Sequence, residues 1–419
     1  MMIMEENELQ SVIRQMRQTA VTLSLLKGDA KNHILHVLSG LLDRRTADIR
    51  TANSKDMEAA AAGGMSDAMQ DRLLLTEERI HGMALSAEKL TELPDPAGRI
   101  LADWTRPNGL HILRKSVPFG VVAMIYESRP NVTVDAASLC LKSGNACVLR
   151  GGKEAHYTNS ILTDIIQQAL TECGIAANAV FSILDPDRRL VHRLLEMRGD
   201  VDLVIPRGGA GLIRFVLENS RVPVIETGTG ICHTYIDRSA DLDKATAIAV
   251  NAKTQRPSVC NAMETLLVHE AAAPAFLSKL FPVLRARGVV IRGDQKVRRL
   301  DPDAEPAAEK DWATEYNDLI LSVKIVSSLK EAILHIATYG THHSECIVAE
   351  DPDAVKEFMN RVDAAVVYAN ASTRFTDGFE FGFGAEIGIS TQKLHVRGPM
   401  GLDALTTYKY EIFGEGQIR

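Results

Sequence analysis

The sequence predicts an α/β protein made of two lobes, and three observations lead to this prediction. Short apolar runs recur between residues 121 and 368 with helical stretches between them, which is typical of parallel sheets covered on both faces. The chain has 419 residues, too many for one ordinary hydrophobic core, so two or three domains are expected. Its composition, 46% hydrophobic and 24% charged, is that of a folded globular protein.

The first hundred residues are predicted to form helices. Their apolar residues recur at helical spacing in two groups, Leu9, Val12, Ile13 and Met16, and Ile34, Leu35, Leu38, Leu41 and Leu42. The run from Ala59 to Ala62, followed by Gly63 and Gly64, indicates a helix that ends there. Pro94 and Pro96 close the helical region because neither can continue a helix.

A β-hairpin is predicted next, centred on Asn108 and Gly109 between two extended runs. Asn-Gly favours a type I′ turn because both residues tolerate positive φ. A two-stranded ribbon is only marginally stable by itself. Leu110 and Ile112 therefore need an apolar partner outside the hairpin, and a neighbouring subunit is the expected one.

Strand candidates then form two series along the chain, separated by helical stretches. The first series comprises residues 121–126, 146–149, 180–184, 201–205 and 222–225, and the second comprises residues 264–269, 289–292, 319–326, 346–349 and 364–368. Two such α/β series imply two lobes, with a ligand cleft expected between them. The segment 371–401 is rich in Gly and Phe and is expected to form loops close to that cleft.

The net charge and the cysteine content indicate which kinds of binding partner and which cellular compartment to expect. A formal net charge of −7 argues against nucleic acid or an anionic membrane surface, since both attract basic proteins. No apolar run approaches the ~20 residues that span a bilayer, and residues 1–10 are acidic without the apolar core of a signal peptide. The six cysteines are scattered and form no CxxC pair, which indicates reduced thiols. A cytoplasmic protein is therefore expected.

Cys260 is the candidate nucleophile. Pro257 limits the helical reach of the residues before it, so Cys260 is expected on a loop or a first helical turn. Lys253 and Arg256 supply positive charge nearby, and a neighbouring cation favours the thiolate, the species that attacks a carbonyl carbon. The alternative is that Cys260 is a small buried residue that happens to follow basic neighbours.

The remaining cysteines and the paired histidines are weaker candidates. Cys140 and Cys147 lie in apolar helix and strand contexts, which indicates a place in the core. His342, His343 and Cys346 stand close together in the sequence, but adjacent residues on a strand point to opposite faces and no second ligand cluster exists. No metal site is predicted.

Two glycine-containing turns are candidate phosphate sites. The strand at 201–205 leads through Gly208 and Gly209 into an apolar helix, an arrangement that turns helix N-terminal N–H groups outward. The turn matches neither GxGxxG nor a Walker motif, and tight αβ connections also use glycine. Arg150 and Lys153 flank a second turn and are candidates for the adenosine 2′-phosphate of NADP. The alternative for these two cations is a solvated basic turn.

Taken in order, the motifs of this chain resemble those of the aldehyde dehydrogenase superfamily and, within it, of the gamma-glutamyl phosphate reductases. The resemblance covers nearly the whole chain and lies in residues 117–121, 126–133, 141–145, 205–209, 251–261, 368–378 and 407–409. The motifs Arg129-Pro130-Asn131 and Gln255-Arg256-Pro257 are the most specific to this branch.

The resemblance implies an aldehyde-dehydrogenase-like α/β fold with a Rossmann-like cofactor lobe, a catalytic lobe and an oligomerisation β-ribbon. The NADPH-binding domain is then expected at residues 1–104 and 118–228, and the catalytic domain with Cys260 at residues 229–395. Residues 105–117 and 400–419 would supply the ribbon, and a homo-oligomer is expected.

The activity that the resemblance implies is reduction of L-glutamyl 5-phosphate by NADPH to L-glutamate 5-semialdehyde and phosphate, the second step of proline synthesis. Cys260 would attack the acyl phosphate to give a thioester, which hydride then reduces. The alternative is an aldehyde-oxidising NAD(P) dehydrogenase of the same superfamily, in which Glu226 would activate water. Functional coupling to a glutamate 5-kinase is left open.

The resemblance also assigns roles to further residues. Asn131 is the expected donor to the carbonyl oxygen, although Glu127 stands where the wider superfamily keeps its asparagine. Cofactor contacts are expected from Arg150, Lys153, Gly208, Gly209 and Glu315, the last of them at the nicotinamide ribose. Contacts to the carboxylate and phosphate of the substrate are expected from Arg129, Lys253, Arg256 and Arg374.

Overall fold

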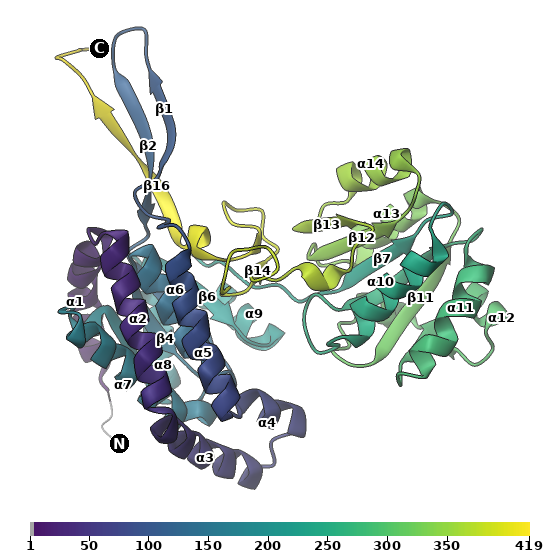
Figure 1. Cartoon of the computed structure of the whole chain (residues 1–419), viewed down its shortest axis with the longest axis horizontal. Helices are drawn as coiled ribbons and strands as arrows, with labels where there is room; N and C mark the ends of the chain where they lie inside the picture. The colour runs from purple at the N-terminus through teal and green to yellow at the C-terminus, as the bar shows by residue number, and fades with distance from the viewer. Residues whose placement is uncertain (1–3) are drawn as a thin grey trace. The chain divides into compact units, whose positions relative to one another are not determined.

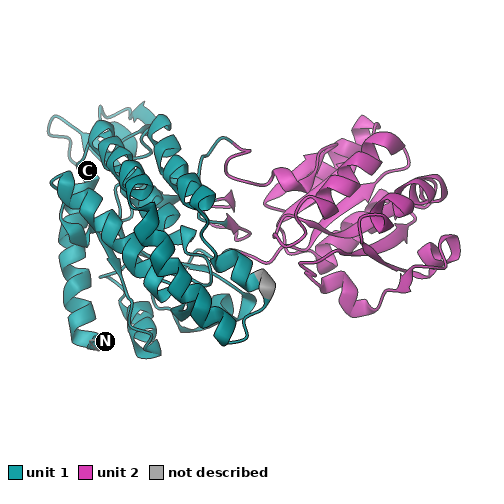
Figure 2. Cartoon of the chain, turned by 60° about the horizontal axis from the view of Figure 1, so that its bottom comes forward, with its two compact units in different colours: residues 1–227, 382–388, 400–419 teal, residues 228–381, 389–399 magenta. Residues whose placement is uncertain are grey.

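The computed structural model describes residues 4–419, apart from the side chains of residues 67 and 68, so the first three residues of the stretch 1–10 lie outside it. The chain forms two compact units, shown in teal and magenta in Figure 2. Unit 1 comprises the residues up to Thr227 together with Gly382–Gly388 and Met400–Arg419, and unit 2 comprises Gly228–Phe381 and Ile389–Pro399. The catalytic domain expected at 229–395 is one continuous segment, whereas residues 382–388 of that range pack within unit 1.

The N-terminal part of unit 1 is helical, as predicted. The order of the helices is α1 (Glu6–Ser24), α2 (Gly28–Arg44), α3 (Thr46–Ala62), α4 (Asp67–Leu73) and α5 (Glu77–Lys89). The apolar residues that predict the first two helices are buried, among them Leu9, Ile13 and Met16 of α1 and Leu35 and Leu38 of α2. The predicted stop after Ala62 is also confirmed.

The sheet of unit 1 has four parallel strands in the order β5-β4-β3-β6. The strands are β3 (Val121–Tyr126), β4 (Ala146–Arg150), β5 (Val180–Ser182) and β6 (Leu203–Arg207). They are followed in turn by α6 (Asn131–Ser143), α7 (His156–Glu172), α8 (Arg188–Glu196) and α9 (Ala210–Asn219). The chain runs outward from β3 to β5 and then returns to β6 on the other side of β3. The topological switch point, where open α/β sheets bind ligands, therefore lies at the carboxyl ends of β3 and β6.

One predicted strand of this lobe is wrong. Residues 222–225 form no strand, and Val224 makes only an isolated bridge to Val204 of β6. Pro223 stands inside the segment and has no backbone N–H to donate to a ladder. Pairing is accordingly limited to the Pro223 carbonyl and the Ile225 N–H, both of which bond to Val204.

Unit 2 contains a seven-stranded parallel sheet in the order β10-β9-β11-β8-β7-β12-β13. The strands are β7 (Cys232–Ile236), β8 (Met263–His269), β9 (Val290–Gly293), β10 (Glu305–Pro306), β11 (Ile320–Val326), β12 (Ser344–Val348) and β13 (Val366–Ala369). The helices are α10 (Leu242–Thr254), α11 (Ala273–Arg285), α12 (Gln295–Leu300), α13 (Leu329–Tyr339) and α14 (Pro352–Arg361). The sequence predicts five of these strands and misses β10 and the interior strand β7.

The segment 371–401 is largely irregular, as predicted. Its regular elements are short: a 3-10 turn at Thr373–Phe375 and two strands, β14 (Ile389–Ser390) and β15 (Gly398–Pro399), which pair with each other. Irregular backbone of this kind is where functional side chains are often carried.

Strands β1 (Ile100–Thr105), β2 (His111–Pro118) and β16 (Thr406–Phe413) form an antiparallel ribbon with β2 in the middle. Figure 1 shows the ribbon extending beyond the helices of unit 1. The predicted type I′ turn is wrong, because Gly109 has a φ of 86° whereas the φ of Asn108 is not positive. Pro107 favours the second position of a type I turn. The loop matches a type I turn closed by the Gly109 N–H on the Arg106 carbonyl (2.9 Å), with Gly109 as the left-handed residue.

Candidate active site

Cys260 lies in the irregular turn that links α10 to β8 in unit 2. α10 ends at Thr254 because Pro257 disfavours helical backbone in the residue before it. Cys260 is partly exposed, on the loop that the sequence predicts. The Cys232 thiol donates to the Cys260 carbonyl oxygen (3.2 Å), and Gly230 lies so close that a Cβ atom there would overlap the same carbonyl.

Arg374 interacts electrostatically with Cys260, and Arg256 interacts in turn with Arg374. Arg256 is exposed and Arg374 is half-buried. Partial burial and, next, the charge of Arg256 lower the pKa of Arg374, whereas Cys260 acts in the opposite direction. Arg374 is held by Gln255, which accepts from its Nε (2.8 Å), and by the Asn261 side-chain oxygen. The arrangement can hold an anionic group beside the thiol.

Lys253 does not belong to this cluster. Its side chain is fully buried, and its ammonium group lies 2.6 Å from Oε2 of Glu264, which is also fully buried. Burial lowers the pKa of Lys253 and raises the pKa of Glu264 to about 7, although each charge favours the other. A lysine without exposed atoms has no way to contact a substrate from this position. We therefore correct its expected substrate contact to a structural ion pair beneath the turn.

Glu315 also contributes to the environment of Cys260, because it binds the backbone of the neighbouring Gly230. Its Oε1 accepts from the N–H of Gly230 at 2.8 Å, and Gly230 packs against the Cys260 backbone. One carboxylate oxygen is thus engaged within unit 2. A carboxylate has two oxygens that accept hydrogen bonds, so Oε2 can accept the hydrogen bond expected from the nicotinamide ribose.

The switch point of unit 1 brings Arg129 and Asn131 together. Both line a cavity of about 70 Å³ that also includes Asp135 and Arg207. Asn131 opens α6 and donates from Nδ2 to Asp135 (2.9 Å). Burial raises the pKa of Asp135 to about 6, against the opposing effects of Asn131 and Arg207. The buried Nε of Arg207 has no hydrogen-bond partner among the described residues.

Glu127 supports the glycine turn before α9. Its Oε2 accepts from the N–H of Gly209 at 2.9 Å, and a Cβ on Gly208 would collide with the same carboxylate. Both glycines are exposed. Glu127, which stands where the wider superfamily keeps an asparagine, therefore stabilises the turn as a hydrogen-bond acceptor. An ionised carboxylate cannot donate a hydrogen bond.

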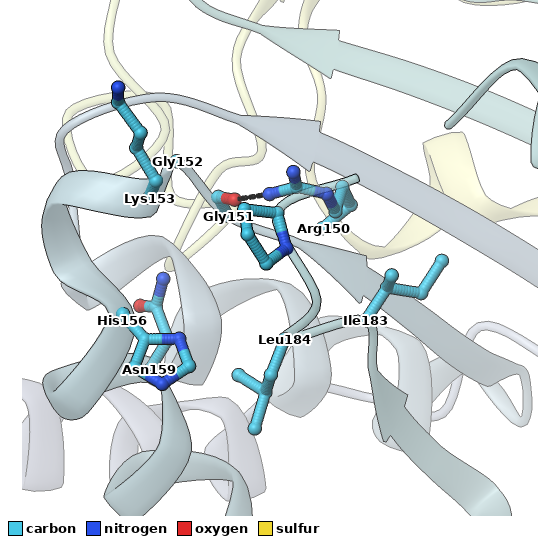
Figure 3. Close-up of a pocket in the computed structure, with 9 residues that line it drawn as sticks. Arg150, Gly151, Gly152, Lys153, His156, Asn159, Ile183 and Leu184 are labelled. Atoms are coloured by element: carbon cyan, nitrogen blue, oxygen red, sulfur yellow. Dashed lines mark hydrogen bonds between the residues drawn. The ribbon is translucent and has the colours of Figure 1, made fainter. Parts of the chain in front are cut away.

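A second cavity, of about 180 Å³, lies at the carboxyl end of β4 and the start of α7. Its lining includes Arg150, Lys153, His156 and Asn159 and, among the described residues, contains no carboxylate, although Glu154 and Asp185 lie near enough to act on Arg150. Figure 3 shows Arg150 donating to the Gly151 carbonyl, with Lys153 on the same turn. The Nε of Arg150 is buried without a hydrogen-bond partner among the described residues, and burial lowers the pKa of this arginine. An anion beside the guanidinium would offset that cost, so the cavity suits a phosphate.

The predicted residues thus fall into separate groups. Cys260 lies with Arg256 and Arg374 in unit 2, whereas Asn131 belongs to unit 1. Glu226 is partly exposed in the irregular segment before unit 2. Six further residues of these groups are not predicted from the sequence: Gly230, Cys232, Gln255, Asn261, Asp135 and Arg207. The pair Gln255 and Asn261 could have been found, because both lie inside the motif that contains Cys260.

The described residues show neither a cluster that could hold a metal ion nor a helix that could cross a membrane. Within residues 4–419, His, Cys, Asp and Glu side chains nowhere gather in threes or more at a place that could hold a metal ion. None of the described helices combines the length and apolar character needed to cross a membrane.

Comparison with known proteins gives a consistent result. The model of the aldehyde dehydrogenase family matches residues 2–297. Over 412 residues the chain is 56% identical to a gamma-glutamyl phosphate reductase of Moorella thermoacetica, which covers 98% of this chain and 99% of that protein. The corresponding protein of Thermobifida fusca is 52% identical over 414 residues, with 99% of each chain covered. The crystal structure of gamma-glutamyl phosphate reductase from Thermotoga maritima is 48% identical, with a TM-score of 0.96 over 98% of this chain and 100% of that one.

Proposed function

Because the chain belongs to the aldehyde dehydrogenase family, and within it to the gamma-glutamyl phosphate reductases, we propose that it reduces L-glutamyl 5-phosphate with NADPH through a thioester on Cys260. The chain is an oxidoreductase of proline biosynthesis, a glutamate-5-semialdehyde dehydrogenase that uses a nicotinamide cofactor. The observation that supports the finer proposal is the partly exposed thiol of Cys260, which interacts with Arg374, a cation that also lies near Arg256.

The cations suit the substrate that we propose. An acyl phosphate of glutamate carries negative charge on its phosphate and on its α-carboxylate, and arginine binds both groups with paired hydrogen bonds. Arg374 is oriented by Gln255 and Asn261, so its geometry is set before the substrate arrives. The same positive charge favours the thiolate form of a cysteine.

The reaction begins with attack of the Cys260 thiolate on the acyl carbon. A carbon–sulfur bond forms, the carbon–oxygen bond to phosphate breaks, and inorganic phosphate leaves with the electron pair. When bound, the nicotinamide supplies the hydride that reduces the resulting thioester to the aldehyde. Negative charge develops on the carbonyl oxygen during the attack, so preorganised donors contribute strongly. We assign the Cys260 N–H and Asn131 to this role, since the Asn131 amide has a second hydrogen beyond the one given to Asp135.

NADPH is proposed to bind unit 1. Arg150 and Lys153 would hold its 2′-phosphate in the cavity at the end of β4, where a carboxylate would instead favour NADH. Gly208 and Gly209 would allow the cofactor phosphates to approach the start of α9, with Glu127 keeping the turn in place. Glu315 would contact the nicotinamide ribose.

One assay separates this proposal from an aldehyde-oxidising dehydrogenase in which Glu226 activates water. In the reverse direction the reductase needs inorganic phosphate to release the acyl group from Cys260, whereas the dehydrogenase uses water. We expect reduction of NADP by glutamate 5-semialdehyde to require phosphate, as measured by absorbance with and without it. Turnover that is independent of phosphate would support the dehydrogenase instead.

A further inference from the structure

We propose that Cys232 is a positioning residue for the nucleophile, and that its thiol fixes the peptide plane between Cys260 and Asn261 by donating to the Cys260 carbonyl oxygen. This inference rests on the proposed function, in which Cys260 attacks the substrate. Cys232 itself touches neither substrate nor cofactor in this scheme.

The turn that carries Cys260 depends on such contacts because it has no helix or strand of its own. The position of the Cys260 α-carbon is restricted by Gly230, whose missing Cβ leaves room for the Cys260 carbonyl. On the following residue, the carbonyl of Asn261 accepts from Thr373 (2.8 Å) and its Nδ2 donates to the Thr376 carbonyl (2.9 Å). The hydrogen bond from the Cys232 thiol additionally fixes the orientation of the Cys260 carbonyl. Together these contacts set the direction in which the Cys260 side chain leaves the backbone.

Cys232 is a suitable donor because its place in the fold is rigid. It opens β7, an interior strand paired on both sides, and its side chain is fully buried. The pairing of β7 with β8 shifts register between Cys232 and His233, the kind of irregularity that redirects a side chain near a site. Burial, followed by the charge of Glu345, raises the pKa of Cys232 well above its usual range, so the thiol keeps the hydrogen that it donates.

Among the described residues, a second acceptor within reach of the Cys232 thiol is Nδ1 of His343, and geometry favours the Cys260 carbonyl. Nδ1 of His343 lies 3.6 Å from the Cys232 sulfur, farther than the 3.2 Å to the carbonyl oxygen. That nitrogen is also 2.8 Å from the Ser344 hydroxyl, which can donate to it. The Cys232 hydrogen is therefore directed to the Cys260 carbonyl.

Cys346 provides a matched control within the same sheet. It lies on β12, adjacent to β7, is fully buried, and donates its thiol to the carbonyl of Ala371 at 3.0 Å. Cys346→Ala removes the same volume and the same type of hydrogen bond without changing the contacts of Cys260. A difference between the two alanine variants thus reports on positioning rather than on packing.

The test compares Cys232→Ala and Cys232→Val, which lack a donor, with Cys232→Ser, which keeps one. The variants are measured for kcat, for KM of NADPH, for thermal stability and for the rate at which iodoacetamide alkylates Cys260, followed by mass spectrometry. We expect kcat and the alkylation rate to fall by on the order of tenfold in the variants without a donor, since small misplacements of a reacting group are costly. KM of NADPH should stay unchanged, and Cys232→Ser should remain within about threefold of the wild type.

Each outcome decides the inference. If Cys232→Ala and Cys346→Ala have the same kcat and the same alkylation rate at Cys260, Cys232 has no positioning role. The inference also fails if Cys232→Ser is as slow as Cys232→Ala. Should the alanine variant not fold, the valine variant supplies the same comparison. An active Cys260→Ala enzyme would overturn the proposed function itself, which is a separate result.

Discussion

At the scale of single residues, the thiol of Cys260 is proposed to carry the covalent step, and its replacement by alanine tests that step directly. We expect Cys260→Ala to lose turnover to below about a hundredth of the wild-type rate, because no thioester can form. NADPH binding, measured by fluorescence titration, should be nearly unchanged, since the proposed cofactor contacts lie mainly in unit 1. The control is Cys173→Ala, which removes another partly exposed thiol far along the sequence. A Cys260→Ala enzyme with substantial activity would exclude the thioester.

Asp135 supports a prediction about pH. Burial raises its pKa from about 4 to about 6, so between these values the folded protein binds a proton that the unfolded chain does not. Asp135 therefore contributes stability that is fully present below about pH 4 and is lost as the pH rises through about 6. The Tm of the wild type relative to Asp135→Asn should fall between about pH 4 and pH 8, on the order of a few degrees. A constant difference across this range, measured by calorimetry, would contradict the raised pKa.

At this scale, two neighbouring cations show what the sequence predicts about the site and what it does not. Lys253 and Arg256 lie three positions apart beside Cys260, and the sequence gives both the same expected role. The structure separates them because Lys253 faces the core of unit 2, where Glu264 pairs with it, whereas Arg256 is exposed. The deciding information is the position of Glu264 on β8. No local pattern around Lys253 contains it.

At the scale of elements, the turn between β4 and α7 is expected to choose the cofactor. Replacing Arg150 and Lys153 together by glutamine should raise the KM of NADPH far more than that of NADH, because only NADPH has the 2′-phosphate. Each lost charge-assisted contact is expected to cost about 1.5–3 kcal/mol. The control is Arg44→Gln, which removes an exposed cation from α2 of the same unit. Equal changes for the two cofactors, in steady-state kinetics, would place the 2′-phosphate elsewhere.

β3, whose apolar residues form a continuous run, is predicted well, whereas β7, which contains buried polar residues, is missed. β3 is predicted with its observed bounds, Val121–Tyr126, because every residue in it is apolar and buried. The interior strand β7 is missed because His233 and Thr234 interrupt its apolar pattern. His233 is buried only because Glu345 of β12 accepts from its backbone N–H (2.8 Å) and lies 3.0 Å from its ring. Such a partner is known only once the sheet has formed.

At the scale of the whole molecule, the ribbon presents an apolar face for which the described chain offers no cover. Trp104 of β1, Ile112 of β2 and Ile412 of β16 lie opposite one another in register, so their side chains share one face. Trp104 and Ile412 are exposed, with 37% and 59% of their surface accessible. The other face carries Asp103 and Glu411 opposite Leu113, which suits solvent. We propose that the apolar face packs against a second copy of this chain.

Charges placed on the apolar face should therefore reduce the size of the assembly while unit 1 stays folded. We expect Ile112→Asp on this face, combined with Leu110→Asp in the adjoining turn, to give smaller species in light scattering, because each buried carboxylate would lack a partner at the interface. NADPH binding should persist, since no residue of the ribbon lines the cavity where we propose that the cofactor binds. Leu113→Asp is the control, because it places a carboxylate on the same strand but on the opposite face. If the double variant and this control have the same mass in solution, the apolar face is not an interface, and the contact would have to be sought along the free edge of β16 at Tyr408–Phe413.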